Sequence, residues 1–129
     1  MLDIKDFLLN ILKDKLDPGI EFQTGRLDEK EKSVFITNDV EQVKEKAYNA
    51  KYFKQNIAII LHWNDNYTET RKKALEIYKI IKSLSMELCD ENTMIIKCKM
   101  DDDFPSDYKT KIKIYAQEID FQVLYIKAE

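Results

Sequence analysis

The sequence predicts an α+β fold, in which an antiparallel or mixed β-sheet is covered on one face by two α-helices. Two stretches place apolar residues at helical spacing, and several others show the alternating or short continuous apolar patterns typical of strands. These elements do not follow the regular strand–helix alternation of a parallel α/β sheet. At 129 residues the chain fits one domain with its own core, so residues 1–129 are predicted to form a single unit.

The two predicted helices span residues 3–16 and 68–84. Asp3 can cap the first helix, which ends before a Pro–Gly turn because proline disfavours helical backbone in the residue that precedes it. Asn66 or Thr68 can cap the second. Each helix has one apolar side, which we expect to pack on the sheet. These sides consist of Ile4, Phe7, Leu8, Ile11, Leu12 and Leu16 in the first helix and Ala74, Leu75, Ile77, Tyr78, Ile81 and Leu84 in the second.

The strand at 55–62 is expected to be central, because its apolar residues point to both faces of the sheet. In the strand at 109–126, apolar residues are even-numbered in the first part and odd-numbered in the second, which predicts a bulge near Gln117 and Glu118. The segment 39–51 is predicted to be a loop. The remaining predicted strands are 20–25, 33–38 and 94–100, the last with Met94, Ile96, Cys98 and Met100 on one face.

The composition excludes several classes of protein. With two glycines, the chain cannot form a P-loop, a dinucleotide-binding loop or a nucleophile elbow. A net charge of −3 with interleaved acids and bases gives no positive field for specific nucleic-acid binding. No apolar run is long enough to span a membrane, and the N-terminus lacks the pattern of a secretory signal. Cys89 and Cys98 are therefore predicted to be free thiols in a reducing compartment, and no cofactor is predicted.

The sequence His62-Trp63-Asn64-Asp65 lies where a strand ends and a helix begins, a place where binding residues often gather. A histidine beside a carboxylate could act as a general base. His62 is the only histidine, however, and no serine has the context of a nucleophile. We therefore expect His62 and Trp63 to be structural or to contact a partner.

The second candidate is an acidic segment with Asp101, Asp102, Asp103 and Asp107. Carboxylates bind hard cations, but the spacing lacks the glycine and terminal glutamate of an EF-hand loop, so a solvated turn is favoured over a metal site. Phe104, next to a proline in this hydrophilic loop, suggests an anchor on this chain or on a neighbour. Trp63, Asp101, Asp102, Asp103 and Phe104 are the predicted partner contacts.

Three stretches combine a strand that ends in His-Trp, an amphipathic helix, and a final strand with alternating aromatic and aliphatic residues. They read AKYFKQNIAIILHWNDN, then YTETRKKALEIYKIIKSL, and finally IKIYAQEIDFQVLYIK. Together they resemble the tail-terminator, tail-completion and minor capsid proteins of tailed bacteriophages. The resemblance implies a protein without catalytic residues that forms a ring, commonly a hexamer, at the head-proximal end of the tail.

Such a ring caps the tail tube and joins the tail to the filled head. The resemblance thus implies a tail-tube protein and a head-completion protein as partners, and a location in the virion, or in the host cytoplasm during assembly. Segments 39–51 and 101–108 would supply contacts. DNA would pass through the ring without specific binding, so the acidic segment is expected at the lumen or against a basic patch, because a basic lumen would hold phosphates.

Two other classes of function stay open from the residues. The chain could be a small hydrolase or nuclease that uses His62 with Asp65, or the cluster Asp101–Asp103. The acid-x-Lys pairs that a nuclease would need do not fall in the predicted central strand, which weakens that alternative. A regulatory module that binds one protein partner is the third possibility.

Overall fold

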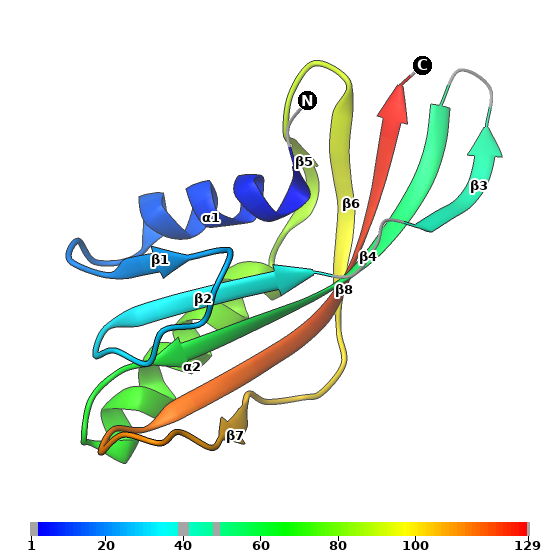
Figure 1. Ribbon diagram of the computed structural model, residues 1–129. Helices are drawn as coiled ribbons and strands as arrows, with labels where there is room; N and C mark the ends of the chain where they lie inside the picture. The colour runs from blue at the N-terminus through cyan, green and yellow to red at the C-terminus, as the bar shows by residue number, and fades with distance from the viewer. Residues whose placement is uncertain (1–2, 39–41, 48–49, 129) are drawn as a thin grey trace.

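The sheet is organised around two 13-residue strands, β4 (Ala50–His62) and β8 (Ala116–Ala128), which pair antiparallel along their whole length (Figure 1). The computed structural model describes residues 3–38, 42–47 and 50–128, and these form an α+β fold with two helices on a mixed sheet of eight strands. The other elements are α1 (Ile4–Lys15), β1 (Glu21–Gln23), β2 (Ser33–Asn38), β3 (Gln42–Ala47), α2 (Tyr67–Lys82), β5 (Ser85–Leu88), β6 (Thr93–Met100) and β7 (Ser106–Tyr108).

The neighbours of the central pair change along its length. At the end where His62 pairs with Ala116, β2 lies beside β4 and the short β7 lies beside β8. At the end where Ala50 pairs with Ala128, β3 lies beside β4, and β6 followed by β5 lies beside β8. We call these the proximal and the distal end. The pair β1–β2 is parallel and the other pairs are antiparallel, which confirms the mixed sheet.

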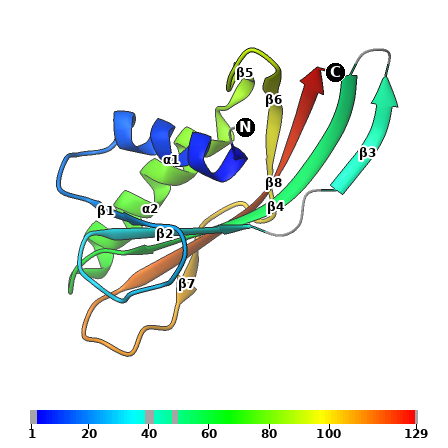
Figure 2. The same ribbon diagram turned by 45° about the horizontal axis from the view of Figure 1, so that its top comes forward.

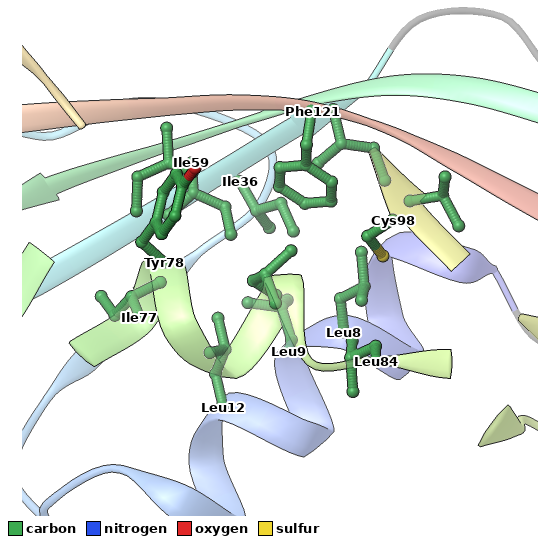
Figure 3. Close-up of a cluster of buried hydrophobic side chains, with 14 of the residues drawn as sticks. Leu8, Leu9, Leu12, Ile36, Ile59, Ile77, Tyr78, Leu84, Cys98 and Phe121 are labelled. Carbon is green, nitrogen blue, oxygen red and sulfur yellow. The ribbon is translucent and has the colours of Figure 1, made fainter. Parts of the chain in front are cut away.

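Both helices begin at the predicted caps. The carboxylate of Asp3 accepts a hydrogen bond from the backbone N–H of Lys5 (3.0 Å), and the side-chain oxygen of Asn66 accepts one from that of Glu69 (3.0 Å). These side chains satisfy backbone donors that have no partner within the helix. Both helices cover the same face of the sheet, which we call the inner face (Figures 2 and 3).

The inner face carries the hydrophobic core, and its strand residues are the ones predicted from alternation. In β4 and β8, alternate residues are at most 2% exposed: Ile57, Ile59, Leu61, Ile119, Phe121, Val123 and Tyr125. Ile77 and Ile81 of α2 are fully buried in the same cluster, as predicted; Figure 3 shows Ile77 beneath the sheet. Cys89 and Cys98 are free thiols; burial raises the pKa of Cys89 to about 11 and that of Cys98 to about 12.

The loop predicted at 39–51 is wrong where the structure describes it. Residues 42–47 form β3, and β4 already begins at Ala50, so the two strands form a hairpin at the distal end; residues 39–41 and 48–49 lie outside the described residues. The strands of this hairpin are held by backbone hydrogen bonds, which need no apolar alternation. Their charged sequence therefore does not indicate a strand. The edge strand β5, not predicted either, extends the sheet beyond β6.

The bulge predicted near Gln117 and Glu118 is also wrong. The register between β4 and β8 runs without a shift from Ala116 to Ala128. The even-numbered isoleucines, Ile112 and Ile114, precede the strand in a segment of bends, so they set no strand face. The change of parity therefore marks the beginning of β8.

A register shift occurs instead in β6, between Ile95 and Lys97. It separates the four residues predicted to share one face. Met94 pairs with Ile126 on the outer, helix-free face, whereas Cys98 pairs with Val123 on the inner face. A bulged residue exchanges the faces of the strand that carries it.

Candidate functional site

His62 lies on the outer face at the proximal end, and its side chain is fully buried. Its ring lies edge-on to that of Tyr108, with 5.9 Å between the ring centroids. Within the described part of the chain neither ring nitrogen has a hydrogen-bond partner. Burial lowers the pKa of His62, and the nearby carboxylate of Glu29 opposes this effect. The imidazole is thus held neutral, and among the described residues no hydrogen bond or ion pair joins it to the exposed Asp65.

Trp63 follows directly and packs against the core of its own chain. Two ammonium groups lie over its ring, that of Lys73 at 5.1 Å and that of Lys32 at 5.8 Å from the centroid. Lys73 is held in turn by the carboxylates of Asp17 (3.1 Å) and Glu76 (2.8 Å). Through Lys73, Trp63 therefore links α2 to the end of β4, and its contact with a partner stays a prediction.

The predicted contact residues of the acidic segment lie in exposed bends between β6 and β7. Asp101, Asp102 and Asp103 are exposed, and Phe104 is 63% exposed. The segment is attached to the sheet and to α2 through its backbone: the N–H of Asp101 donates to the carbonyl of Asp120 (3.0 Å), and the hydroxyl of Tyr78 donates to that of Asp102 (2.8 Å). The anchor in this loop is the buried Pro105, whose carbonyl accepts from Arg71, and the ring of Phe104 stays available to a partner.

Asp107 does not join the other three aspartates. It lies in β7, where its carboxylate accepts a hydrogen bond from the hydroxyl of Tyr67 (3.0 Å) and another from the side-chain amide of Gln117. The buried Gln117 also accepts from Arg71. This network links β7 and β8 to α2, so the predicted group of four carboxylates is a group of three.

Two further carboxyl groups, which the sequence analysis did not single out, lie side by side on the outer face. Glu118 and Asp120 are alternate residues of β8, and both are half-buried. Burial, followed by hydrogen bonding to Asp120, raises the pKa of Glu118 to about 7. Asp120 also lines a hollow of about 230 Å³ together with Asp101. This part of the outer face is therefore acidic.

The distal end of the molecule carries an exposed apolar patch. All residues of β5 are exposed, with Met86 at 60% and Leu88 at 70%. Leu88 lines a hollow of about 190 Å³ together with Met94 and Ile126 of the outer face. Three exposed acidic residues, Glu87, Asp90 and Glu91, belong to the same hairpin, and Glu91 lines the hollow. We call these five residues the distal tip: Met86, Glu87, Leu88, Asp90 and Glu91.

The proximal end carries a second apolar patch of a different kind. Tyr67 and Tyr115, at 40% and 47% exposure, meet edge to face with their ring centroids 5.3 Å apart, beside Ile112 at 40%. Ile112 and Tyr115 line a hollow of about 320 Å³ that also includes Asp65. Three exposed lysines, Lys109, Lys111 and Lys113, belong to the same segment, and Lys113 lines the hollow. We call these six residues the proximal tip: Tyr67, Lys109, Lys111, Ile112, Lys113 and Tyr115.

The proximal tip is fixed by hydrogen bonds on both sides. Tyr115 exchanges backbone hydrogen bonds with the segment after β4, donating to the carbonyl of Asn64 (2.8 Å) and accepting from the N–H of Trp63 (3.1 Å). The carboxylate of Glu29 accepts from the N–H of Lys111 (2.9 Å) and from the hydroxyl of Thr110 (3.0 Å). The exposed residues are thus held in place before any partner arrives.

Sequence reasoning missed the two tips for different reasons. Alternating lysines and isoleucines in 109–115 look like a strand, although the segment bends, and the short β5 has too few residues to show a period. The only available signal was the charge pattern: three lysines at alternate positions before β8, and three acids between residues 87 and 91.

No family model and no curated protein sequence matches this chain. Within residues 3–38, 42–47 and 50–128, no group of three or more histidine, cysteine or acidic side chains is arranged to hold a metal ion. None of the described helices is both long and apolar enough to cross a membrane. The two exposed tips and the acidic segment are therefore the features on which we base a function.

Proposed function

We propose that this protein is a structural protein of a tailed bacteriophage, a tail terminator or head–tail joining (minor capsid) protein whose copies form a ring that caps the tail tube. The resemblance in the strand ending in His-Trp, in the helix that follows and in the last strand suggests this function. The α+β fold, with both helices on one face of the sheet, is compatible with it.

The observation that carries the proposal is the exposure of large apolar side chains at both ends of the sheet. Leu88 is 70% exposed at the distal end, and Tyr115 is 47% exposed at the proximal end. Apolar groups that gather on a surface within a charged rim are typical of protein–protein contacts. A ring subunit needs two such contacts, one for each neighbour.

The acidic segment has a place in the same proposal. Asp101, Asp102 and Asp103 are exposed, and Asp101 lies next to Asp120 of β8. In a ring these groups would face the lumen, where negative charge keeps the passing DNA from binding. Substituting the three exposed aspartates by asparagine is expected to leave ring assembly intact and to slow DNA delivery, as measured by genome ejection or packaging retention.

The decisive experiment compares phage tails assembled with and without this protein. Without it, we expect tails that exceed the normal length and do not join filled heads, as seen by electron microscopy. Adding the purified protein back is expected to restore both length and joining. Tails of normal length that join heads in its absence would show that the protein has another function.

A further inference from the structure

We infer that the distal tip of one copy docks on the proximal tip of a second copy, so that the chain associates head to tail. This inference deepens the proposed function, on which it rests for the closed ring, because it names the two surfaces through which neighbouring subunits would meet. Figure 1 shows the tips at opposite ends of the long β4–β8 pair, with β5 at the top and the start of β8 at the lower left.

Each tip has the composition expected of one of the two surfaces in a protein–protein interface. The distal tip offers the aliphatic and thioether side chains of Leu88 and Met86, which are 70% and 60% exposed. The proximal tip offers two tyrosine rings and Ile112, which is 40% exposed. Aromatic residues and methionine are enriched at the centres of protein interfaces, and methionine adapts to irregular surfaces. Contact of the two patches would remove both from water.

The charges around the two patches have opposite signs. The exposed acids Glu87, Asp90 and Glu91 belong to the distal segment, and the exposed lysines Lys109, Lys111 and Lys113 belong to the proximal one. Two distal tips, or two proximal tips, would bring like charges together, which is unfavourable. A distal tip against a proximal tip pairs acids with lysines, so the charges select the head-to-tail arrangement. Three carboxylates at the proximal tip have the opposite sign to its lysines: Asp65 lines the hollow, Asp107 accepts from the hydroxyl of Tyr67, and Glu29 is bound by Thr110 and the backbone of Lys111.

The two tips are different surfaces of the chain, so the contact between them is heterologous. The tips lie at opposite ends of a 13-residue strand, which is about 40 Å at the usual rise of about 3.3 Å per residue. A contact between two different surfaces leaves one of each free after every addition. It therefore generates a ring where the rotation between subunits closes, as the proposed function requires.

The test is self-association of the full chain, measured by analytical ultracentrifugation over a range of concentrations. Two exposed apolar residues are replaced separately, Leu88→Asp in the distal tip and Ile112→Asp in the proximal tip. Each variant alone is expected to be monomeric, because one of its two surfaces is lost. An equimolar mixture is expected to form one-to-one dimers and nothing larger, because each dimer joins the one intact distal tip to the one intact proximal tip.

Charge reversal provides the second test. The first variant is Lys109→Glu/Lys113→Glu; it keeps Lys111, whose backbone N–H donates to Glu29. The second variant is Glu87→Lys/Glu91→Lys. It keeps Asp90, because the carboxylate of Asp90 accepts from the turn N–H groups of Asn92 and Thr93 (both 2.8 Å). Each is expected to weaken self-association about tenfold or more. Mixing the two variants, or combining all four substitutions in one chain, is expected to restore it. The matched control Lys72→Glu/Lys79→Glu, on exposed positions of α2, is expected to associate like the unaltered chain.

The outcomes separate this inference from the proposed function. Unaltered protein that stays monomeric at all concentrations would overturn the inference, as would variants that associate normally. A mixture of Leu88→Asp and Ile112→Asp without dimers would overturn it as well. In each case the proposed function is judged separately, by tail length and head joining, because a ring could close through other surfaces or only on the tube. Thermal melts of each variant identify any that do not fold, and the mixing experiments then rest on the other pair.

Discussion

The two faces of strand β8 differ although they belong to one backbone. On the inner face, Ile119, Phe121 and Val123 are at most 1% exposed beneath the helices. On the outer face, the residues between them are half-buried and mostly polar, including Glu118, Asp120 and Gln122. Packing alone explains the inner face, since each side chain there fills the core. The outer face instead keeps polar and acidic side chains partly exposed to water.

At the proximal end of the outer face, neighbouring segments cover the sheet and bury its side chains. There the connection before β8 and the loop with Glu29 enclose His62, so an outer-face side chain becomes as buried as the core. At the distal end of the same face, neither of the two described helices lies over Met94 and Ile126, which are only half-buried. Burial on this face therefore follows the loops, whereas on the inner face it follows the helices.

The largest difference is expected between two adjacent residues of β8. Phe121→Ala removes a fully buried ring from the inner face and should lower the free energy of unfolding by about 3 to 5 kcal/mol. Gln122→Ala on the outer face removes only an exposed contact to Asn56 (3.3 Å) and should change it by about 0.5 kcal/mol or less. Urea unfolding of both variants measures the difference. Similar losses would show that the outer face is packed as tightly as the inner one.

A second pair of variants examines the helix that covers the inner face. Ile77→Ala should cost about 2 to 5 kcal/mol, because Ile77 is fully buried between α2 and the sheet. Lys79→Ala, two residues further on and exposed, is the control and should change stability by about 0.5 kcal/mol or less. Thermal or urea melts are sufficient. An unchanged transition for Ile77→Ala would contradict the packing of α2 on the sheet.

The difference between the two faces also explains which parts of the fold could be predicted from the sequence. Ile57, Ile59 and Leu61 alternate with a period that follows directly from burial on one side, so the central strand and its inward face were correctly predicted. Both caps were correctly predicted because a side-chain oxygen before an apolar stripe has a local role, which does not depend on the rest of the chain.

The missed features depend on contacts that no local pattern reveals. The hairpin of β3 and β4 is made by backbone pairing between charged strands, and the sequence of 42–47 has no apolar period to show it. Ile112 and Ile114 have strand-like spacing, but hydrogen bonds to Glu29 and Asn64 hold their segment in bends. Of the predicted contact residues, Asp101–Asp103 and Phe104 are indeed exposed, whereas both tips required the folded structure to be noticed.

The buried histidine on the outer face predicts a loss of stability on the acid side. Burial lowers the pKa of His62 below its usual 6.5. Between the lowered pKa and 6.5, the unfolded chain therefore binds a proton at this histidine that the folded chain does not bind. The neutral imidazole contributes stability above pH 6.5 that is lost as the pH falls through the lowered pKa. His62→Leu should remove this part of the slope, measured by urea unfolding at several pH values.

The direct measurement is an NMR titration, since His62 is the only histidine of the chain. We expect its ring to stay neutral below pH 6.5 while the protein is folded. Glu29→Gln should lower the pKa of His62 further, because the carboxylate of Glu29 favours the charged ring. A titration midpoint at or above 6.5 would show that the loops leave the ring open to water.

A second pH-dependent effect concerns Glu118 and has the opposite sign to that of His62. Burial and the hydrogen bond to Asp120 raise the pKa of Glu118 from 4.5 to about 7, so the folded chain keeps a proton that the unfolded chain releases. The contribution of this carboxyl to stability is present below pH 4.5 and is lost as the pH rises through about 7. Glu118→Gln, which stays neutral, should therefore flatten the fall in stability between these values, and Asp120→Asn should do so in part by removing the neighbouring charge. Urea unfolding of the three proteins at closely spaced pH values measures the slopes. Equal slopes in the unaltered protein and in Glu118→Gln would mean that water reaches this carboxyl freely, and that the acidic part of the outer face is as open as the tips.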